Sequence, residues 1–169
     1  MLPDYLAPNL DIVFVGINPG TYSDRARHYF ARPTNLFWTA LYEAGFVNER
    51  LAPQDDARMN TFGYGLTDLV TRPTPNIDAL QRDEFVRGGE ILRGKIIECA
   101  PRIACFVGIV GYRAAYDKRA QFGAQSSSPA WGNTKLFIVP STSPRNAYYR
   151  SQVIDWFKRL KAYRDRLDA

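Results

Sequence analysis

The sequence predicts an α/β protein, a three-layer α/β/α sandwich around a short, largely parallel central sheet. Two observations lead to this fold class. Short apolar runs typical of buried strands alternate along the chain with segments whose apolar residues recur at helical spacing. The first and last of these runs also pass directly into loops rich in Gly, Pro or Ser, as the strands of open parallel sheets do. We expect all 169 residues to form one domain.

Four segments are predicted as strands. The runs at 11–17, 103–109 and 135–140 are rich in Ile, Val and Phe, and a shorter strand is expected near 64–70. Because the carboxyl ends of parallel strands meet at one edge of a sheet, the loops that follow the first and last strands should emerge side by side.

Helices are predicted at 35–45, 83–99 and 111–122, and a long basic helix is predicted after Asn146. Asn35 is expected to cap the first of them. Segments 48–58 and 125–132 are interpreted as loops. The inner faces of the second and fourth helices are marked by apolar residues at helical spacing, namely Phe85, Leu92, Ile96 and Cys99, and Val153, Phe157 and Leu160.

Composition narrows the class of protein. A hydrophobic content of 46% and a charged content of 23% are ordinary for a globular domain. No segment approaches the ~20 apolar residues of a membrane span, and no signal peptide opens the chain, so we expect a cytoplasmic protein without a membrane partner. The net charge of +5 suits a polyanionic partner. Cys99 and Cys105 are interpreted as reduced core thiols, and a single His argues against a zinc site.

A glycine-flanked loop, Gly16-Ile17-Asn18-Pro19-Gly20, follows the first apolar run. Its two glycines allow a sharp turn and close approach to a ligand, while Pro19 stiffens the turn. Asn18 would then lie at the carboxyl end of a strand, where its amide can hold a water or a carbonyl oxygen but cannot act as a general base. A simple turn with a capping Asn is the alternative interpretation.

A second loop, Ser141-Thr142-Ser143-Pro144-Arg145, follows the last strand. Hydroxyl groups, backbone N–H groups and an arginine at a strand-to-helix junction are suited to holding a phosphate. Ser143 could also be a helix N-cap with Pro144 at the first helical position, and the two roles are compatible.

Together these segments resemble the mismatch-specific uracil-DNA and thymine-DNA glycosylases of the uracil-DNA glycosylase superfamily. The first motif of that family, GINPG, is present letter for letter, and its second motif matches Val139 to Arg145. Segments 30–38 and 65–74 match two further blocks in the family's order, so the resemblance runs from about Leu6 to Arg145.

The resemblance implies a monofunctional uracil-DNA glycosylase, a DNA repair hydrolase that flips uracil out of DNA and cleaves its N-glycosidic bond to leave an abasic site. It implies no cofactor and no metal. The expected partner is double-stranded DNA with U:G or related lesions, or single-stranded DNA, and the protein is expected to act as a monomer.

The resemblance also assigns roles to residues of the base pocket. Asn18 would hold the attacking water below C1′ of the sugar, and Phe30 would stack on the flipped base. Ser23 would line the pocket near C5 of the base, beside Tyr22. The remaining pocket residues are Gly16, Ile17 and Gly20. Phe30 could instead be a core residue beside Phe37 and Trp38, and Ser23 could be loop surface.

Asp68 departs from the family pattern, because relatives commonly carry Asn or Lys at this place. A carboxylate near C1′ could accept a proton from the water and stabilise a cationic sugar, which Asn18 cannot do. A turn or cap residue is the alternative interpretation.

The second loop is expected to contact phosphates and to fill the gap left by the flipped base, through Ser141, Thr142, Ser143 and Arg145. Relatives with a Gly-Leu pair insert an apolar side chain there, whereas Thr142 and Ser143 are small and polar. We therefore expect weak discrimination by the opposite base.

Two other function classes are open, a non-catalytic nucleic-acid-binding α/β domain and a small nucleotide hydrolase. The hydrolase would need an acidic metal-binding cluster, but Asp55 and Asp56 lie in a polar segment and are interpreted as solvated charge. No GxxxxGK[ST] loop occurs. His28 could meet a phosphate or lie on the surface.

Overall fold

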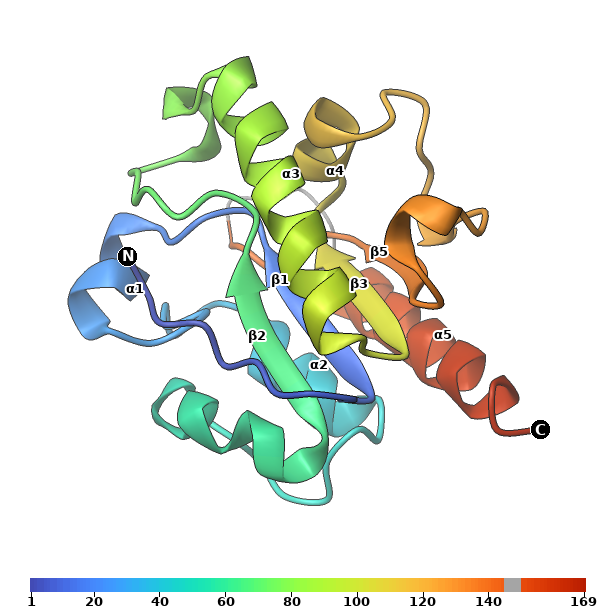
Figure 1. Ribbon diagram of the computed structural model, residues 1–169. Helices are drawn as coiled ribbons and strands as arrows, with labels where there is room; N and C mark the ends of the chain where they lie inside the picture. Colours follow the sequence, from blue (N-terminus) through green and yellow to red (C-terminus); the bar gives the residue numbers. More distant parts are fainter. Residues whose placement is uncertain (145–149) are drawn as a thin grey trace.

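A five-stranded sheet forms the centre of the protein, as seen in the computed structural model, which describes residues 1–144 and 150–169 (Figure 1). The strand order is β2-β1-β3-β5-β4. Four strands run parallel, and they confirm the four predicted ones: β1 (Ile12–Gly16), β2 (Tyr64–Asp68), β3 (Ile103–Val107) and β5 (Lys135–Val139). The two-residue β4 (Gly123–Ala124) adds an antiparallel edge beside β5.

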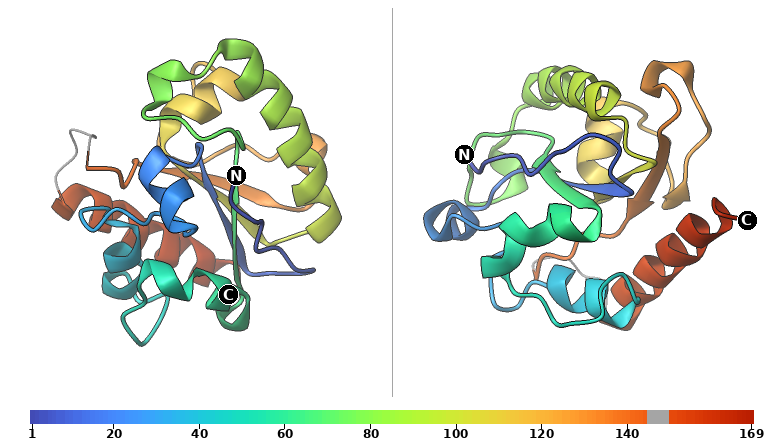
Figure 2. Two further views of the ribbon diagram at one scale, coloured as in Figure 1. Left: turned by 90° about the vertical axis from the view of Figure 1, so that its left-hand side faces the viewer. Right: turned by 60° about the horizontal axis from the view of Figure 1, so that its bottom comes forward.

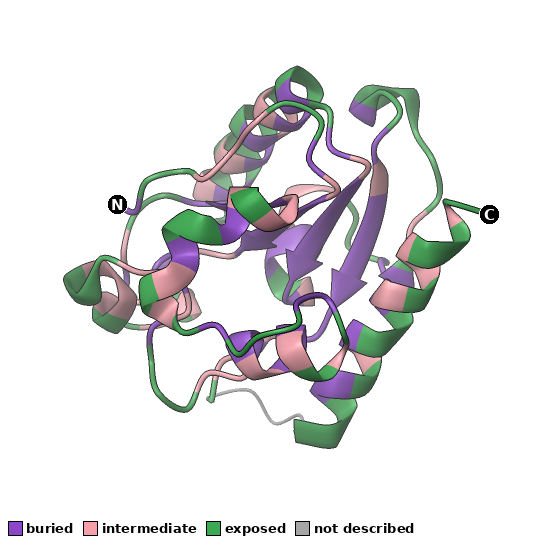
Figure 3. Cartoon of the chain, turned by 90° about the horizontal axis from the view of Figure 1, so that it is seen from below, coloured by how far each residue is buried: buried purple, intermediate pink, exposed green. Residues whose placement is uncertain are grey.

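Helices cover both faces of this sheet. α3 (Arg82–Cys99) and α4 (Ile109–Ala115) pack on one face, and α2 (Phe37–Glu43) and α5 (Arg150–Arg166) pack on the other (Figure 2). Figure 3 shows buried strands between helices that are exposed on their outer sides. The predicted three-layer α/β/α arrangement is confirmed.

Short elements complete the connections. α1 (Thr21–Ala26) follows the loop after β1, and three 3₁₀-helices are present in the described residues: η1 (Pro53–Phe62), η2 (Ile77–Ala79) and η3 (Pro129–Trp131). None of the helices in the described part of the chain has the length and apolar character that a membrane span needs.

The alternation of side chains along β1 divides the core into two clusters. Ile12 and Phe14 contribute to the cluster on the α2 and α5 side, and Val13 and Val15 to the cluster on the α3 and α4 side. Because both faces are covered, every residue of β1 is apolar or Gly, which explains why the sequence run is continuous rather than alternating.

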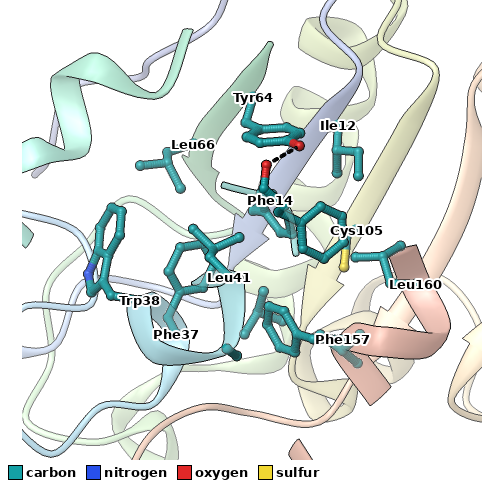
Figure 4. Packing of buried hydrophobic residues seen from close by; sticks show 14 of the residues in the cluster. Ile12, Phe14, Phe37, Trp38, Leu41, Tyr64, Leu66, Cys105, Phe157 and Leu160 are labelled. Atoms are coloured by element: carbon teal, nitrogen blue, oxygen red, sulfur yellow. Dashed lines mark hydrogen bonds between the residues drawn. The ribbon is translucent and has the colours of Figure 1, made fainter. Parts of the chain in front are cut away.

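Phe14 is the centre of the first cluster and is fully buried. Its ring packs edge-on against Phe37 at a centroid distance of 5.3 Å and is stacked with Phe157 at 6.3 Å (Figure 4). Phe46 and Tyr64 add two further edge contacts at 6.0 Å each. This aromatic cluster joins β1 and β2 to both helices of that layer.

The predicted helices at 35–45 and 83–99 are confirmed as α2 and α3, and the Asn35 amide oxygen accepts a bond from the Phe37 N–H at 3.0 Å. The helix predicted at 111–122 is shorter than expected. It ends at Ala115 because Tyr116 leaves the helical path, packs against Trp131 at 5.1 Å, and donates its hydroxyl to the Gly89 carbonyl.

The two predicted loops, the last predicted helix and the predicted core residues can be compared with the structure in the same way. Both loops expected at 48–58 and 125–132 contain 3₁₀ turns, η1 and η3. The long helix predicted after Asn146 is present as α5 (Arg150–Arg166), and its predicted start lies outside the described residues. The expected inner faces of α3 and α5 are buried, and both cysteines are free and buried.

Replacing Phe14 with Ala should lower the free energy of unfolding by about 3–5 kcal/mol, because it empties the centre of a packed aromatic cluster. Urea denaturation of the two proteins measures the difference. Ile97→Ala on α3, where the side chain is 52% exposed, is the control and should change stability little. A loss below about 1 kcal/mol for Phe14→Ala would contradict this view of the core.

Candidate active site

A cavity of about 500 Å³ opens at the carboxyl edge of the sheet. Its wall is built from the ends of the strands and the loops that follow them: Gly16–Gly20 from β1, Asp68 at the end of β2, Val107–Val110 from β3, and Ser141–Pro144 after β5. The chain leaves β1 toward β2 on one side and leaves β3 toward β5 on the other, so the cavity lies at a topological switch point. Open α/β sheets bind ligands at such points.

Gly16 and Asp68 are paired neighbours in the parallel β1–β2 ladder. A Cβ atom on residue 16 would collide with Oδ1 of Asp68 and would lie 3.6 Å from the ring of Phe30. The lack of a side chain at Gly16 therefore gives the carboxyl group of Asp68 its space at the floor of the cavity.

Asp68 is a buried carboxyl group, with 7% of its surface exposed. Its Oδ2 atom has no hydrogen-bond partner among the described residues. Desolvation raises the pKa of Asp68 to about 8, and the negative charge of Asp4 adds to this rise. Such a group changes its charge near neutral pH, as groups that transfer protons must.

Asn18 presents a defined end of its amide to the cavity. Its Nδ2 atom donates to the Arg72 carbonyl at 2.9 Å and to Thr74 Oγ1 at 2.8 Å. Both amide hydrogens are thus used by the protein, and the Oδ1 atom is the group that can accept a bond from a ligand or water. The alternative of a simple capping Asn does not describe these contacts.

Phe30 is both a core residue and a residue of the cavity wall, the two roles that the sequence left open. One face of its ring is stacked on Phe37, with centroids 4.1 Å apart and planes 13° from parallel, and the ring also lines the cavity. Its backbone has a φ of 50°, a left-handed conformation that is unusual for an aromatic residue and concentrates at functional sites.

Ser23 and Tyr22 border the same cavity from α1. The Ser23 hydroxyl accepts a bond from the Ala31 N–H at 3.0 Å, so it fixes the chain beside Phe30. Tyr22 is 43% exposed at the cavity mouth, with the Arg32 guanidinium 5.3 Å from its ring centroid.

The prediction that Asp56 is a solvated charge is wrong, because the residue is only 1% exposed. η1 carries it inward, where its carboxylate accepts a bond from the Tyr29 N–H at 3.0 Å and lies 3.2 Å from Nδ1 of His28. The carboxylate therefore supports the turn that leads to Phe30, and His28 contacts Asp56 rather than lining the cavity.

The second loop contributes Ser141, Thr142 and Ser143 to the cavity wall. Ser141 Oγ accepts a bond from the Ser143 N–H at 3.2 Å, which shapes the loop. Thr142 is 1% exposed and its carbonyl accepts the Leu36 N–H at 3.0 Å, so its buried side chain does not suit the expected insertion into DNA. Arg145 lies outside the described residues.

Thr74 lies in the site but was not predicted as a site residue from the sequence. It is 2% exposed, lines the cavity and contacts the Asn18 amide. The only signal was its place at the end of the 65–74 block, since nothing in a Thr between two prolines indicates a buried hydroxyl. Among the described residues, no cluster of three or more His, Cys, Asp or Glu side chains could hold a metal ion.

Comparison with known proteins agrees with this geometry. The sequence profile described as the Uracil DNA glycosylase superfamily matches residues 3–166. The chain belongs to this superfamily. Membership supports a DNA glycosylase, a hydrolase of DNA repair that has DNA as its substrate.

The fold is also similar to a solved structure. The solution NMR structure of a candidate uracil DNA glycosylase from Methanosarcina acetivorans superimposes with a TM-score of 0.58 at 20% sequence identity, over 95% of this chain and 96% of that one. At this identity the likeness establishes a shared fold.

The pKa of Asp68 predicts a stability change with a defined sign. Because the folded-state pKa of about 8 lies above the ordinary value of 3.8, the folded protein holds an extra proton between these values, and stability falls as pH rises through this range. Asp68→Asn cannot ionise, so its unfolding free energy relative to wild type should increase from pH 5 to pH 9.

Urea denaturation at pH 5, 7 and 9 measures this difference. Asp155→Asn, which removes a carboxylate that is 55% exposed on α5, should show little change with pH. A difference between Asp68→Asn and wild type that stays constant from pH 5 to pH 9 would show that Asp68 is ionised throughout.

Proposed function

We propose that this protein removes uracil from DNA by hydrolysing the bond between the base and its deoxyribose, leaving an abasic site. The observation that carries the proposal is the grouping of an oriented amide, Asn18, a buried carboxyl group, Asp68, and an aromatic ring, Phe30, around one cavity. Membership of the superfamily supports the same reaction.

Uracil must leave the base stack to reach this cavity. Phe30 is suited to hold it, because stacking on Phe37 fixes the ring and a base can lie against the side that borders the cavity. Stacking on an aromatic side chain accepts any base, so selection of uracil depends on polar contacts at the edge of the base.

Hydrolysis requires a water beside C1′ of the sugar as the bond to uracil breaks and the sugar becomes cationic. Asn18 Oδ1 can accept one hydrogen bond from this water and so orient it. Asp68 in its ionised form can accept the proton of the water and stabilise the cationic sugar. The amide of Asn18 thus orients the water, whereas the carboxylate of Asp68 supplies the negative charge that the reaction needs.

The departing uracil carries the electrons of the broken bond as an anion. Backbone N–H groups of the Ile17–Gly20 loop can donate to a uracil carbonyl and stabilise this charge. The water adds its oxygen to C1′ and keeps one proton there as the new hydroxyl group, while its other proton goes to Asp68 and finally to the uracil anion. This sequence needs no covalent intermediate with the enzyme and no cofactor.

Ser141, Ser143 and Arg145 are proposed to hold phosphates around the flipped nucleotide, and the net charge of +5 favours DNA generally. With no large apolar side chain in the described part of this loop, the gap in the duplex would be filled poorly.

The direct test of the function is a gel assay that converts abasic sites to strand breaks after incubation with uracil-containing DNA. The wild-type protein should produce abasic sites. DNA binding without base release would instead support a nucleic-acid-binding domain, and release of phosphate from free nucleotides would support a nucleotide hydrolase.

Asn18→Ala and Asp68→Ala should each slow single-turnover uracil release roughly 100-fold or more, with little loss of DNA binding. Because only ionised Asp68 can accept a proton, the wild-type rate should rise with pH up to about 8, the pKa of this carboxyl group. Asp68→Asn should be slow and should lack this rise. A wild-type rate in Asp68→Ala would assign this carboxyl group to structure alone.

The rates of uracil release from U:G, U:A and single-stranded substrates should be similar in the wild type. The second loop has small polar side chains, so it gains little binding energy from the gap in the duplex or from the opposite base. Ser143→Leu supplies an apolar side chain and should raise the rate on U:G relative to single-stranded DNA. Single-turnover kinetics on the three substrates measures these ratios. Cleavage of U:G alone by the wild type, or unchanged ratios in the variant, would refute this explanation.

A further inference from the structure

Thr74 is attached to the Asn18 loop through its main chain. Its N–H donates to the Pro19 carbonyl and its carbonyl accepts the Thr21 N–H, each at 3.1 Å. These two bonds form a parallel bridge between Gly20 and Thr74. The position of the Thr74 side chain relative to Asn18 is therefore set by the backbone, independently of the hydroxyl group.

The Thr74 hydroxyl has a fixed direction. Its hydrogen is donated to the Asn76 carbonyl at 2.7 Å, so its oxygen can only accept from Nδ2 of Asn18, which lies 2.8 Å away. The second Nδ2 hydrogen is donated to the Arg72 carbonyl at 2.9 Å. Rotating the amide by half a turn would place Oδ1 against the Arg72 carbonyl, which has no hydrogen to donate, and the Thr74 hydroxyl could donate to Oδ1 only by giving up its bond to Asn76. The observed orientation is therefore the more stable one.

We propose that Thr74 is a positioning residue that fixes the Asn18 amide with Oδ1 toward the reacting water. This inference rests on the proposed glycosylase function and adds a residue to it. The same surroundings favour an amide over a carboxylate at position 18, because a carboxylate there would face the Arg72 carbonyl without a hydrogen to share.

Thr74→Val tests the role of the hydroxyl, because it keeps the branched shape and the backbone bridge but removes the acceptor. Single-turnover uracil release should fall about tenfold, as expected when one ordinary hydrogen bond no longer orients a reacting group. The affinity for uracil-containing DNA should stay unchanged. Thr74→Ser, which restores the hydroxyl, should recover most of the rate.

Thr134→Val is a matched control. Thr134 is also a buried threonine, 6% exposed, whose hydroxyl donates to the Pro101 carbonyl at 2.7 Å, but it precedes β5 and so lies at the opposite edge of the sheet. The Thr134→Val variant should be less stable than the wild type but should release uracil at the wild-type rate. If Thr74→Val does not fold, Thr74→Ala, which adds no atoms, applies the same test.

A double-mutant cycle separates orientation of Asn18 from a general structural effect. In the Asn18→Ala background, Thr74→Val should have no further effect on the rate, because the group that it orients is absent. An equal loss in both backgrounds, or a wild-type rate in Thr74→Val, would overturn the inference. Absence of uracil release by the wild type would instead overturn the proposed function.

Discussion

The pairing of Gly16 in β1 with Asp68 in β2 is the contact on which the site depends. Parallel strands bring the two residues side by side, and the missing side chain at Gly16 leaves space that the Asp68 carboxyl group occupies. The Phe30 ring lies against the same space. A single glycine therefore allows a polar group and a stacking surface to meet at the floor of the cavity.

The cavity contains buried polar atoms that a fold selected only for stability would avoid. Asp68 Oδ2 and Thr142 Oγ1 both lack hydrogen-bond partners among the described residues, and Phe30 has a left-handed backbone. Each of these features costs free energy, and their concentration around one cavity indicates a site built for a ligand. The aromatic cluster around Phe14 lies behind the site and offsets such costs.

The sheet could be predicted from sequence because strands that are covered on both faces are largely apolar. β1 and the Leu136–Val139 part of β5 are such runs, and the loops after them contain Gly, Pro and Ser. Asn18 follows from its place at the end of a strand, whereas Asp68 is singled out by the resemblance of its segment to a block of the family. The ends of helices were predicted wrongly where tertiary contacts determine them. α4, for example, ends where Tyr116 packs against Trp131.

Individual hydrogen bonds of the site could not be predicted in this way. The burial of Asp56 depends on η1, whose residues show no apolar periodicity, and the contact of Thr74 with Asn18 depends on a bridge between two irregular segments. The burial of Thr142 depends on the Leu36 N–H, more than a hundred residues earlier in the chain. Sequence spacing carries no information about such contacts.

A crystal structure with DNA that contains a 2′-fluorinated deoxyuridine would test the central claim most directly. The fluorine slows cleavage by destabilising the cationic sugar, so the intact nucleotide can be seen. We expect uracil to lie against Phe30, with a water within about 2.6–3.2 Å of both Asn18 Oδ1 and the Asp68 carboxyl group. A uracil bound outside the cavity, or a water that contacts neither group, would contradict it.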